Sequence, residues 1–460
     1  MVKEGKLKAK DIKNDTIIFV GEDNLHYEKF SDGSVKCIED EVPFGLPDGW
    51  AWVRLGNLSA AIQYGLSNSA EPQGTHRLLR ITDIQDGKVD WNAVPFTTVN
   101  DPEAYLLKTG DIVFARTGAT VGKSFLITET PYPSVYASYL IRIRLLGSLS
   151  PEYIYQFFDS ACYWSQITDK SVGVGQPNCN GTSLKELFIP LPPISEQLRI
   201  VPTAQALLAY VAKIDAEKKS LLSIIMATKS KILDLAIRGQ LIPQDPNDEP
   251  ASVLLERIRA EKEELIRQGK IKRDKKESVI FKGEDNSYYQ KVEADGSVVI
   301  QRVDVPPTWA VCCLQEISYP VSTVGMQIKS EEIQKDGVFP VISQGQSFID
   351  GYYSDESKVI YDSPIILFGD HTRNVKYIDF PFVVGADGTK LHKVIRANER
   401  YVYYWMCHAS QCIADRGYAR HYSLLQKECF TLPPIAEQIR IVNCIDQLFS
   451  QLDSIADALL

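Results

Sequence analysis

The sequence lacks the features that mark membrane, secreted and metal-binding proteins. It has no apolar run of about 18 residues, and its N-terminus, MVKEGKLKAKDIKNDT, is charged, so neither a transmembrane helix nor a signal peptide is expected. The nine cysteines form no C-x-x-C pair, and the six histidines show no H-x-x-x-H spacing. These absences argue against a zinc site and a disulfide framework, and they favour reduced thiols in a cytoplasmic protein.

Strong positive charge is also missing. The 460 residues carry a net charge of −9, which argues against a protein that binds nucleic acid over its whole surface. A locally basic DNA-binding face is still compatible with a chain whose other faces are acidic. The apolar fraction of 44% is ample for folded cores, and the length predicts two or three domains.

A glycine-rich stretch, GDIVFARTGATVGKSFLI at 110–127, comes close to a nucleotide-binding P-loop. In the P-loop pattern four residues precede Gly-Lys-Ser/Thr, whereas only three separate Gly118 from Gly122. The segment that follows, SFLIT, alternates like a strand, but a P-loop requires a helix at that point. We therefore expect strand, turn and strand here, with ATP binding as the weaker alternative.

The chain contains a tandem duplication. Three blocks recur in the same order in its two halves, and the last pair, LPPISEQLRIV and LPPIAEQIRIV, is identical at nine of eleven positions. The matched blocks are residues 17–35 with 279–298, 46–58 with 305–317, and 191–201 with 432–442. The stretches between them, 50–190 and 309–431, show little similarity. This pattern predicts two binding modules that share an architecture and recognise different targets.

Each LPP-I-x-EQ block opens a predicted helix. From Ile194 onward, apolar residues recur at spacings of three, four or seven, which is typical of a coiled-coil seam. Pro202 is expected to kink or restart this helix, and Gly239 to end it before the Pro-rich turn IPQDPNDEP. A second, highly charged helix is expected over ASVLLERIRAEKEELIRQGK, and the apolar pattern of the first helix returns at the C-terminal end.

The order of these features resembles the specificity subunit of type I restriction–modification systems. The resemblance covers essentially the whole chain: variable module, LPPISEQLRIV, long helix, the run AIRGQLIPQDPNDEPA, second variable module and LPPIAEQIRIV. It implies a mixed α/β (α+β) fold with two globular target-recognition domains, separated by long antiparallel coiled-coil-like helices and related by a pseudo-two-fold repeat. Each domain would read one half of a split double-stranded DNA target, and the helices would set the gap between the halves.

The same resemblance implies the partners. Two methyltransferase subunits would dock on the helices and methylate adenine with S-adenosylmethionine, and added restriction or motor subunits would use ATP and Mg. The chain itself would bind no cofactor or metal and catalyse nothing. The residues agree, because the Pro-Pro pairs of the two LPP-I-x-EQ blocks read Leu-Pro-Pro-Ile, without the acceptor and aromatic ring of an amino-methyltransferase loop.

On this basis the chain divides into six segments. They are a lead segment (1–48), a first target-recognition domain (49–190), a central helical spacer (191–275), a repeat of the lead segment (276–308), a second target-recognition domain (309–431) and a C-terminal helix (432–460). Residues 50–190 hold 11 basic and 12 acidic residues, and residues 309–431 hold 12 and 14. Any DNA-binding face must therefore be a minor part of each domain's surface.

The candidate DNA contacts lie in loops that combine Arg or Lys with Asn or Gln, because Arg suits guanine and Asn or Gln suits adenine. In the first domain they are Arg77, Arg80, Arg116, Thr117, Lys123, Gln176, Asn178 and Asn180. In the second domain they are Gln344, Gln346, His371, Thr372, Arg373, Lys390, Arg416, Tyr418, Arg420 and His421. One of the first two arginines is expected to lie on a strand face without a role in binding. For ARTGATVGK, an ordinary hairpin with exposed polar tips remains an alternative.

Two other functions compete with DNA recognition. A stand-alone ATPase or nuclease would depend on Lys123, and a coiled-coil adaptor would bind the same partners without contacting DNA. The Asp370–His371 pair is more typical of a structural hydrogen bond than of catalysis. We therefore expect a DNA-recognition subunit that performs no chemistry.

Overall fold

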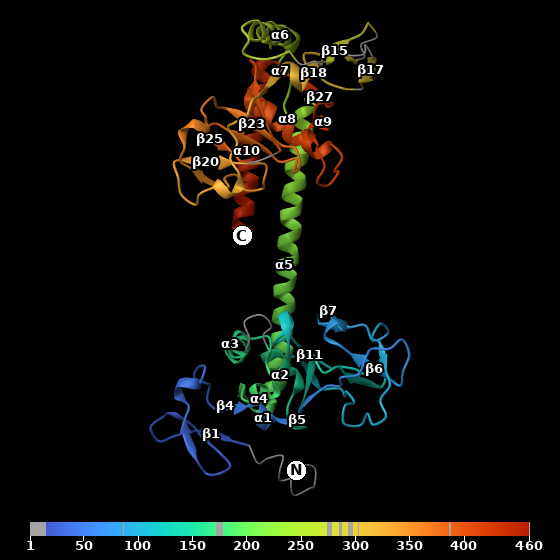
Figure 1. Cartoon of the computed structure of the whole chain (residues 1–460), viewed down its shortest axis with the longest axis vertical. Helices are drawn as coiled ribbons and strands as arrows, with labels where there is room; N and C mark the ends of the chain where they lie inside the picture. Colours follow the sequence, from blue (N-terminus) through green and yellow to red (C-terminus); the bar gives the residue numbers. More distant parts are fainter. Residues whose placement is uncertain are drawn as a thin grey trace. The chain divides into compact units, whose positions relative to one another are not determined.

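The computed structural model describes residues 15–85, 87–171, 178–273, 278–284, 288–292, 298–301, 303–385 and 388–459. The chain divides into two compact units, Met1–Lys213 and Ile214–Leu460. Each unit carries a small antiparallel meander beside a larger module of strands and short helices (Figure 1). The six segment boundaries expected from the sequence remain a prediction.

In the first unit, the meander is β1 (Ile17–Val20), β2 (His26–Lys29) and β3 (Val35–Cys37). The module holds a four-stranded sheet, ordered β11-β10-β13-β5, and a three-stranded sheet, ordered β12-β6-β9. The strands are β5 (Ser59–Tyr64), β6 (His76–Leu79), β9 (Phe96–Thr97), β10 (Ile112–Ala115), β11 (Ser124–Leu126), β12 (Ser134–Tyr136) and β13 (Leu140–Leu145), with a separate hairpin of β7 (Ile84–Gln85) and β8 (Lys88–Val89). The helices are α1 (Leu55–Leu58), α2 (Pro151–Phe157), α3 (Ala161–Lys170) and α4 (Gly181–Lys185).

The second unit repeats this architecture with different side chains. Its meander is β15 (Ser278–Lys282), β16 (Tyr288–Val292) and β17 (Val298–Gln301), and its sheets are ordered β19-β26-β23-β24 and β21-β20-β25-β22. The strands are β19 (Ser318–Val321), β20 (Phe339–Ile342), β21 (Gly351–Tyr353), β22 (Val359–Ile360), β23 (Ile365–Gly369), β24 (Val375–Ile378), β25 (Phe382–Val384) and β26 (Thr389–Val394). The helices are α7 (Leu314–Ile317), α8 (Glu399–Cys412) and α9 (Tyr422–Leu425). Both units contain helices and strands, which confirms the expected mixed α/β class. A parallel pair, β12 with β6 or β25 with β20, stands among antiparallel strands in each unit.

The first and last strands of each module pair with each other. Strand β4 (Ala51–Arg54) pairs antiparallel with β14 (Phe188–Leu191), and β18 (Ala310–Cys313) pairs with β27 (Cys429–Leu432). The indole nitrogen of Trp50 then donates to Glu196 at 3.2 Å, and that of Trp309 donates to Glu437 at 3.0 Å. The repeated Trp and the Glu of LPP-I-x-EQ therefore join the module to the helix that follows it.

The Gln of the same motif makes a second repeated contact. The amide nitrogen of Gln197 donates to the Pro192 carbonyl at 2.9 Å, and its oxygen accepts from the backbone nitrogen of Ser150 at 3.1 Å. Gln438 makes the same two contacts, with Pro433 at 2.8 Å and Asn398 at 2.8 Å. Ser150 and Asn398 are the N-caps of α2 and α8, so the motif fixes equivalent helices in both units.

Three longer helices follow the modules, α5 (Ile194–Ile237), α6 (Ala251–Arg267) and α10 (Ile435–Leu459). Pro202 lies inside the continuous helix α5, so the helix does not restart there, and the kink expected as the other outcome stays a prediction. Proline removes one intrahelical hydrogen bond, but packing holds this turn, since Val201 contacts the module core and its carbonyl accepts from Gln156 at 3.1 Å. The expected end at Gly239 is confirmed, with α5 stopping at Ile237.

Within the second unit, α5 and α10 run side by side in opposite directions. The hydroxyl of Thr431, just before α10, donates to the carbonyl of Ile237 at 2.9 Å, whereas Lys229 of α5 contacts Asp453 near the far end of α10. This pairing order confirms the antiparallel helices expected from the sequence. The seam between them contains the buried residues Ile232, Leu233, Ala236, Ile441, Val442 and Ile445.

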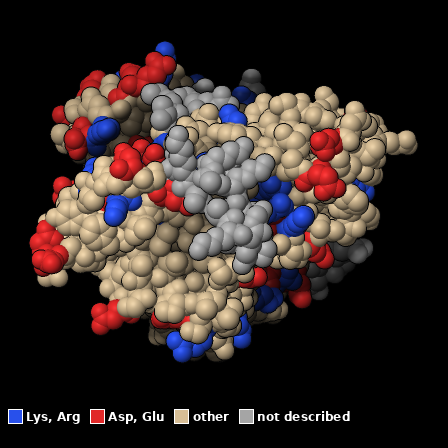
Figure 2. Space-filling view, turned by 90° about the horizontal axis from the view of Figure 1, so that it is seen from below, with Lys and Arg blue, Asp and Glu red and all other residues tan. Residues whose placement is uncertain are grey.

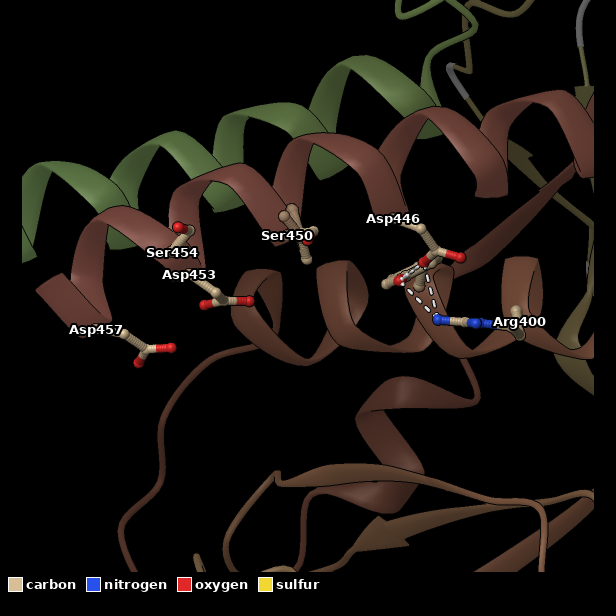
Figure 3. Close-up of a pocket in the computed structure, with 8 residues that line it drawn as sticks. Arg400, Asp446, Ser450, Asp453, Ser454 and Asp457 are labelled. Atoms are coloured by element: carbon tan, nitrogen blue, oxygen red, sulfur yellow. Dashed lines mark hydrogen bonds and ion pairs between the residues drawn. The ribbon is translucent and has the colours of Figure 1, made fainter.

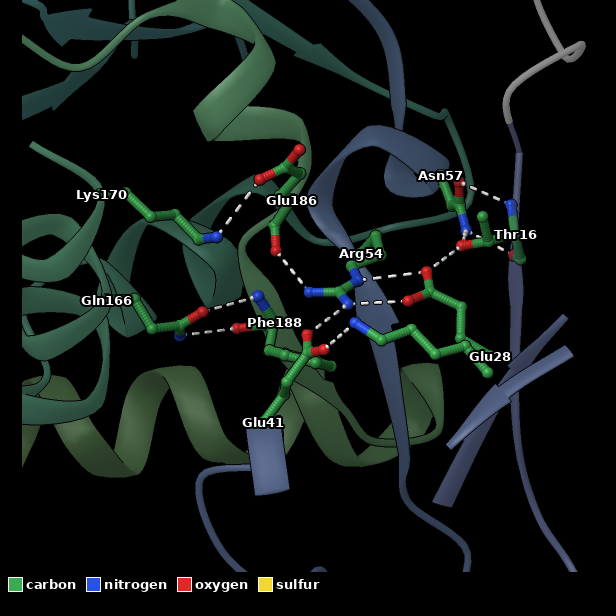
Figure 4. A network of polar contacts seen from close by, with 10 residues as sticks. Thr16, Glu28, Glu41, Arg54, Asn57, Gln166, Lys170, Glu186 and Phe188 are labelled. Atoms are coloured by element: carbon green, nitrogen blue, oxygen red, sulfur yellow. Dashed lines mark hydrogen bonds and ion pairs between the residues drawn. The ribbon is translucent and has the colours of Figure 1, made fainter. Parts of the chain in front are cut away.

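A buried ion pair ties the first meander to its module (Figure 4). The guanidinium of Arg54 contacts the carboxylate of Glu28 at 2.7 Å and that of Glu41 at 3.3 Å, and the side chains of Arg54 and Glu28 are only 12% and 5% exposed. Burial opposes ionisation of Glu28, but hydrogen bonds from Arg54 and Thr16 outweigh it and hold its pKa below the ordinary range. In the second unit Cys313 and Gln290 occupy the equivalent positions, with 3.7 Å between the sulfur and the amide nitrogen.

Candidate nucleic-acid interface

Four loops of the second module meet at one end of its sheets. They follow β20, join β23 to β24, join β25 to β26, and join α8 to α9. The backbone nitrogen of His371 donates to the side-chain oxygen of Gln344 at 3.1 Å, and that of Asp370 donates to the Gly388 carbonyl at 2.7 Å. The backbone nitrogen of His421 donates to the Asp370 carbonyl at 2.8 Å. These contacts link all four loops into one surface, which we call the second loop cluster.

The loop between α8 and α9 supplies the most exposed side chains of the second loop cluster. Tyr418 is 83% exposed, and its ring stacks on the imidazole of His371 with 4.6 Å between centroids and 9° between planes. Arg416 and Arg420 are also exposed beside it. An aromatic platform between two arginines can stack against a base and contact phosphates.

Other predicted residues of this cluster are held by neighbours. Thr372 donates its hydroxyl proton to the Gln344 carbonyl at 2.6 Å, and the guanidinium of Arg373 pairs with Asp415 at 2.6 Å. The ammonium of Lys390 lies 5.7 Å from the ring centroid of Tyr422. Gln346 is exposed in the loop after β20. The structure therefore brings the predicted residues of this domain together, while Arg373 shares its charge with a carboxylate.

His421 requires a correction. Its side chain is 0% exposed, so it cannot touch DNA in this conformation. One ring nitrogen accepts from the backbone nitrogen of Arg416 at 3.1 Å, and the other lies 3.1 Å from the Asp370 carbonyl. The sequence cannot distinguish such a histidine from an exposed one, because its burial depends on how two distant loops pack. His421 is a positioning residue for the loop that carries Arg416 and Tyr418.

The first module has an equivalent group of loops, which we call the first loop cluster. Strands β10 and β11 occupy the sheet positions of β23 and β24, so the stretch ARTGATVGK matches the loop that carries His371. The backbone nitrogen of Arg116 donates to the Tyr139 carbonyl at 3.1 Å, and Thr117 forms a β-bridge with Asn178. Lys123 is exposed at the end of the same turn. Gln176 lies outside the described residues.

The glycines of this stretch shape a hairpin. Strands β10 and β11 are antiparallel and joined through a 3-10 turn at Gly118–Thr120, which confirms the expected strand, turn and strand. Gly122 has a φ of +89°, and a Cβ there would lie 2.6 Å from the ring of Trp164. The Tyr163 hydroxyl donates to the carbonyl of Gly122 at 2.6 Å. Since no helix follows the turn, the arrangement lacks the N-terminal amides that hold phosphate in a P-loop.

The remaining predicted residues of the first domain have structural contacts. Arg77 lies on β6, with its guanidinium 3.9 Å from the ring centroid of Phe96, and it is the arginine on a strand that the sequence predicted. Arg80 pairs with Asp83 at 2.6 Å. The side chain of Asn180 caps α4. None of these contacts joins the three residues to Arg116 and Lys123.

Two residues of the loop clusters were missed by the sequence. Tyr139 is 61% exposed in the loop between β12 and β13, next to Arg116. Lys376 is buried, and its ammonium donates to the carbonyls of Ser343, at 2.8 Å, and Ser347. Burial lowers the pKa of Lys376, and the two carbonyls fix the loop that presents Gln344. Neither residue stands out in the sequence, because each acquires its place only from the order of strands in the sheets.

Charge on the molecular surface is mixed. On the face in Figure 2, Lys and Arg lie among Asp and Glu on a mainly uncharged surface.

In the described part of the chain, no group of three or more His, Cys, Asp or Glu side chains is placed to hold a metal ion. The described helices include none that is long and apolar enough to cross a membrane.

A pocket of about 700 Å³ lies along α10 and beside α8 (Figure 3). Its lining includes Asp446, Asp453 and Asp457, and Arg400 reaches Asp446 at 2.8 Å. Three carboxylates against one guanidinium make this surface unsuited to DNA phosphates. The pocket lining includes none of the residues of the second loop cluster, and its charge differs from that of the exposed arginines there.

Comparison with known proteins agrees with this geometry. The model of the type I restriction modification DNA specificity domain matches residues 47–224 and 306–459. The specificity subunit of the type I restriction enzyme EcoEI from Escherichia coli is 27% identical over 300 residues, which cover 52% of this chain and 48% of that protein. The EcoAI specificity subunit, also from Escherichia coli, is 26% identical over 298 residues, with the same coverage. The chain spans about half the length of these curated relatives.

Solved structures share the fold. A chain from a structural study of complex assembly and conformational transition in a type I R-M system has a TM-score of 0.61 at 18% identity, covering 91% of this chain and 94% of that chain. The HsdS subunit from Thermoanaerobacter tengcongensis has a TM-score of 0.50 at 18% identity, covering 90% and 93%. Because the family model matches well over half of the residues, on both repeated modules, the chain belongs to the type I restriction–modification DNA specificity family.

Proposed function

We propose that this chain is the DNA-recognition subunit of a type I restriction–modification complex and catalyses no reaction itself. Each loop cluster reads one half of a split double-stranded DNA target. The observation that carries the proposal is that two equivalent scaffolds present different side chains at equivalent loops, Arg116, Thr117 and Lys123 in one and His371, Thr372 and Arg373 in the other. Such a pair of surfaces suits an asymmetric target with two unlike halves.

The contacts within the second loop cluster suggest separate roles. Arg416 and Arg420 are exposed and suit phosphate or guanine, and Gln344 presents an amide that suits adenine. The stacked pair of Tyr418 and His371 supplies an apolar surface of fixed orientation. In the first loop cluster, the Arg116 guanidinium lies 4.9 Å from the ring centroid of Tyr64 and is held in place by it.

The proposed partners are two methyltransferase subunits, which supply S-adenosylmethionine chemistry, and restriction or motor subunits that use ATP and Mg. The repeated frame supports two copies of one partner, since the Trp–Glu contact and both Gln contacts recur in each unit. The DNA target places the complex in the cytoplasm. This chain contributes recognition and spacing.

The test is adenine methylation mapping in a methylation-free host that co-expresses the chain with its cognate methyltransferase subunit. The expected result is a split motif with two short halves around a fixed gap. In the variant Arg416→Ala/Arg420→Ala, only one half should become less specific, while Arg267→Ala, an exposed arginine on α6, serves as the matched control. Loss of specificity in both halves at once would contradict the two-cluster model.

A further inference from the structure

The two meanders form a repeated surface that DNA recognition leaves unexplained. The family model begins at residue 47 in the first half and at 306 in the second, so both meanders lie outside it. The modules beside them have diverged, yet IIFVGEDNLHYEKF and VIFKGEDNSYYQKV are still identical at eight of fourteen positions. A surface that stays alike beside two different DNA-reading modules is suited to a partner that is the same on both sides.

The outer face of the first meander is apolar except for Lys29. Cross-strand pairing places Ile17, Lys29 and Val35 in one row and Phe19, Tyr27 and Cys37 in the next. Ile17 is 67% exposed, and Phe19 is exposed while its ring stacks on that of Tyr27 with 5.8 Å between centroids. The opposite face is covered at its centre, because Ile18 and Glu28 pack against the module, while Val20 at its end is 56% exposed.

The second meander repeats both rows. Its backbone register aligns Val279, Lys291 and Val298, and then Phe281, Tyr289 and Ile300. Phe281 is 44% exposed and stacks on Tyr289 with 5.8 Å between centroids, as Phe19 does on Tyr27. Ile280, the equivalent of Ile18, is buried against Val311 and Cys313. The same aromatic pair therefore faces outward in both copies.

The charge around these rows narrows the choice of partner. Residues 15–46 hold eight acidic and two basic residues, and residues 278–305 hold five and three. DNA phosphates would be repelled by the first meander. A second copy of this chain would bring acidic surfaces together, which also disfavours it. The charges fit a different protein whose apolar patch is bordered by Lys and Arg.

We infer that the outer face of each meander docks one copy of the same methyltransferase subunit, through an apolar centre on Ile17 and Phe19 or on Phe281 and an acidic border that includes Glu22 or Glu284. This inference rests on the proposed function, which supplies a partner in two copies. The inference adds the meanders as a second docking surface, in addition to the helices. Glu22 and Glu284 are exposed at matching turns, so they provide a paired electrostatic test.

The probe is the purified cognate methyltransferase subunit, titrated onto the full-length chain, with the mass of the complex measured by light scattering after size exclusion. Wild type should carry two subunits. Ile17→Ser/Phe19→Ser and Phe281→Ser should each weaken binding of one subunit at least tenfold, and their combination should weaken both. Glu22→Lys and Glu284→Lys should act in the same direction without touching the apolar centre. Val338→Ser, at an exposed apolar residue elsewhere, is the matched control.

The outcomes separate the inference from the proposed function. If the apolar and charge variants all bind two subunits with the affinity of wild type, the docking surface is wrong while the proposed function stands. If wild type binds the subunit but the variants lose DNA affinity alone, the meanders belong to the DNA interface and the inference fails. If wild type binds no methyltransferase subunit, both the proposed function and the inference fail.

Discussion

On the proposed function, adding one methyl group at Gly388 should disturb recognition of one half of the DNA target. Gly388 has a φ of +83°, and a Cβ there would lie 2.5 Å from the amide nitrogen of Gln344 and 2.8 Å from the ring of His371. Both side chains must therefore move in Gly388→Ala. The left-handed backbone costs a non-glycine residue about 1–2 kcal/mol, and loss of a good base contact costs about 1–3 kcal/mol, roughly 5- to 150-fold in discrimination.

The control separates backbone strain from displacement. Gly325 has a φ of +76°, and no atom lies within 4 Å of the position that a Cβ would take. Gly325→Ala therefore introduces backbone strain without displacing a side chain. Both variants should lose about 1–2 kcal/mol in urea unfolding. Only Gly388→Ala should alter methylation rates on duplexes with single substitutions in one half, and the other half should be read as before. Equal discrimination by the two variants would refute the assignment of Gln344 and His371 to the interface.

Three further predictions concern buried polar groups. Lys376→Met removes the ammonium that binds the Ser343 and Ser347 carbonyls, so stability should fall by about 1–3 kcal/mol and discrimination of the same half should weaken, as measured by urea unfolding and methylation rates. Burial lowers the pKa of His392 to about 4 from 6.5. The free energy of unfolding is therefore highest above pH 6.5, and it should fall by up to about 3 kcal/mol as the pH falls from 6.5 toward 4. His392→Phe should flatten this part of the stability–pH curve, and an unchanged acid slope would contradict the assignment. Glu28→Gln should cost about 1–3 kcal/mol, and adding Arg54→Cys, which reproduces the second unit's pair, should restore part of that loss in a double-mutant cycle.

The frame of this protein is predictable from its sequence, because its determinants are local or repeated. The LPP-I-x-EQ blocks marked the starts of α5 and α10, and Gly239 marked the end of α5. The helix does not restart at Pro202, since sequence shows the hydrogen bond that proline removes but not the packing around Val201 and Gln156 that keeps the turn helical. Local patterns therefore predicted the element, and tertiary contacts decided its continuity.

The loop clusters were only partly predictable for a different reason. Composition located the loops, because Arg, Lys, Asn and Gln gather there, but it did not show which side chains face outward. Tyr418 and His421 lie three residues apart in one loop, and one is 83% exposed while the other is 0% exposed. That difference arises from the contact of His421 with Asp370, about fifty positions away in sequence, and no local pattern encodes it.

The duplication shows how such a protein can change what it reads without losing its fold. The contacts that recur in both units join the module to its helix, such as Trp50 with Glu196 and Trp309 with Glu437, and none of them involves a loop-cluster side chain. Where a joining contact does differ, both members differ together: Arg54 and Glu28 in one unit are Cys313 and Gln290 in the other. Replacing only one member of the ionic pair would leave a buried charge without its partner, which is costly. The two members of this buried contact must therefore change together, whereas an exposed loop side chain can change alone.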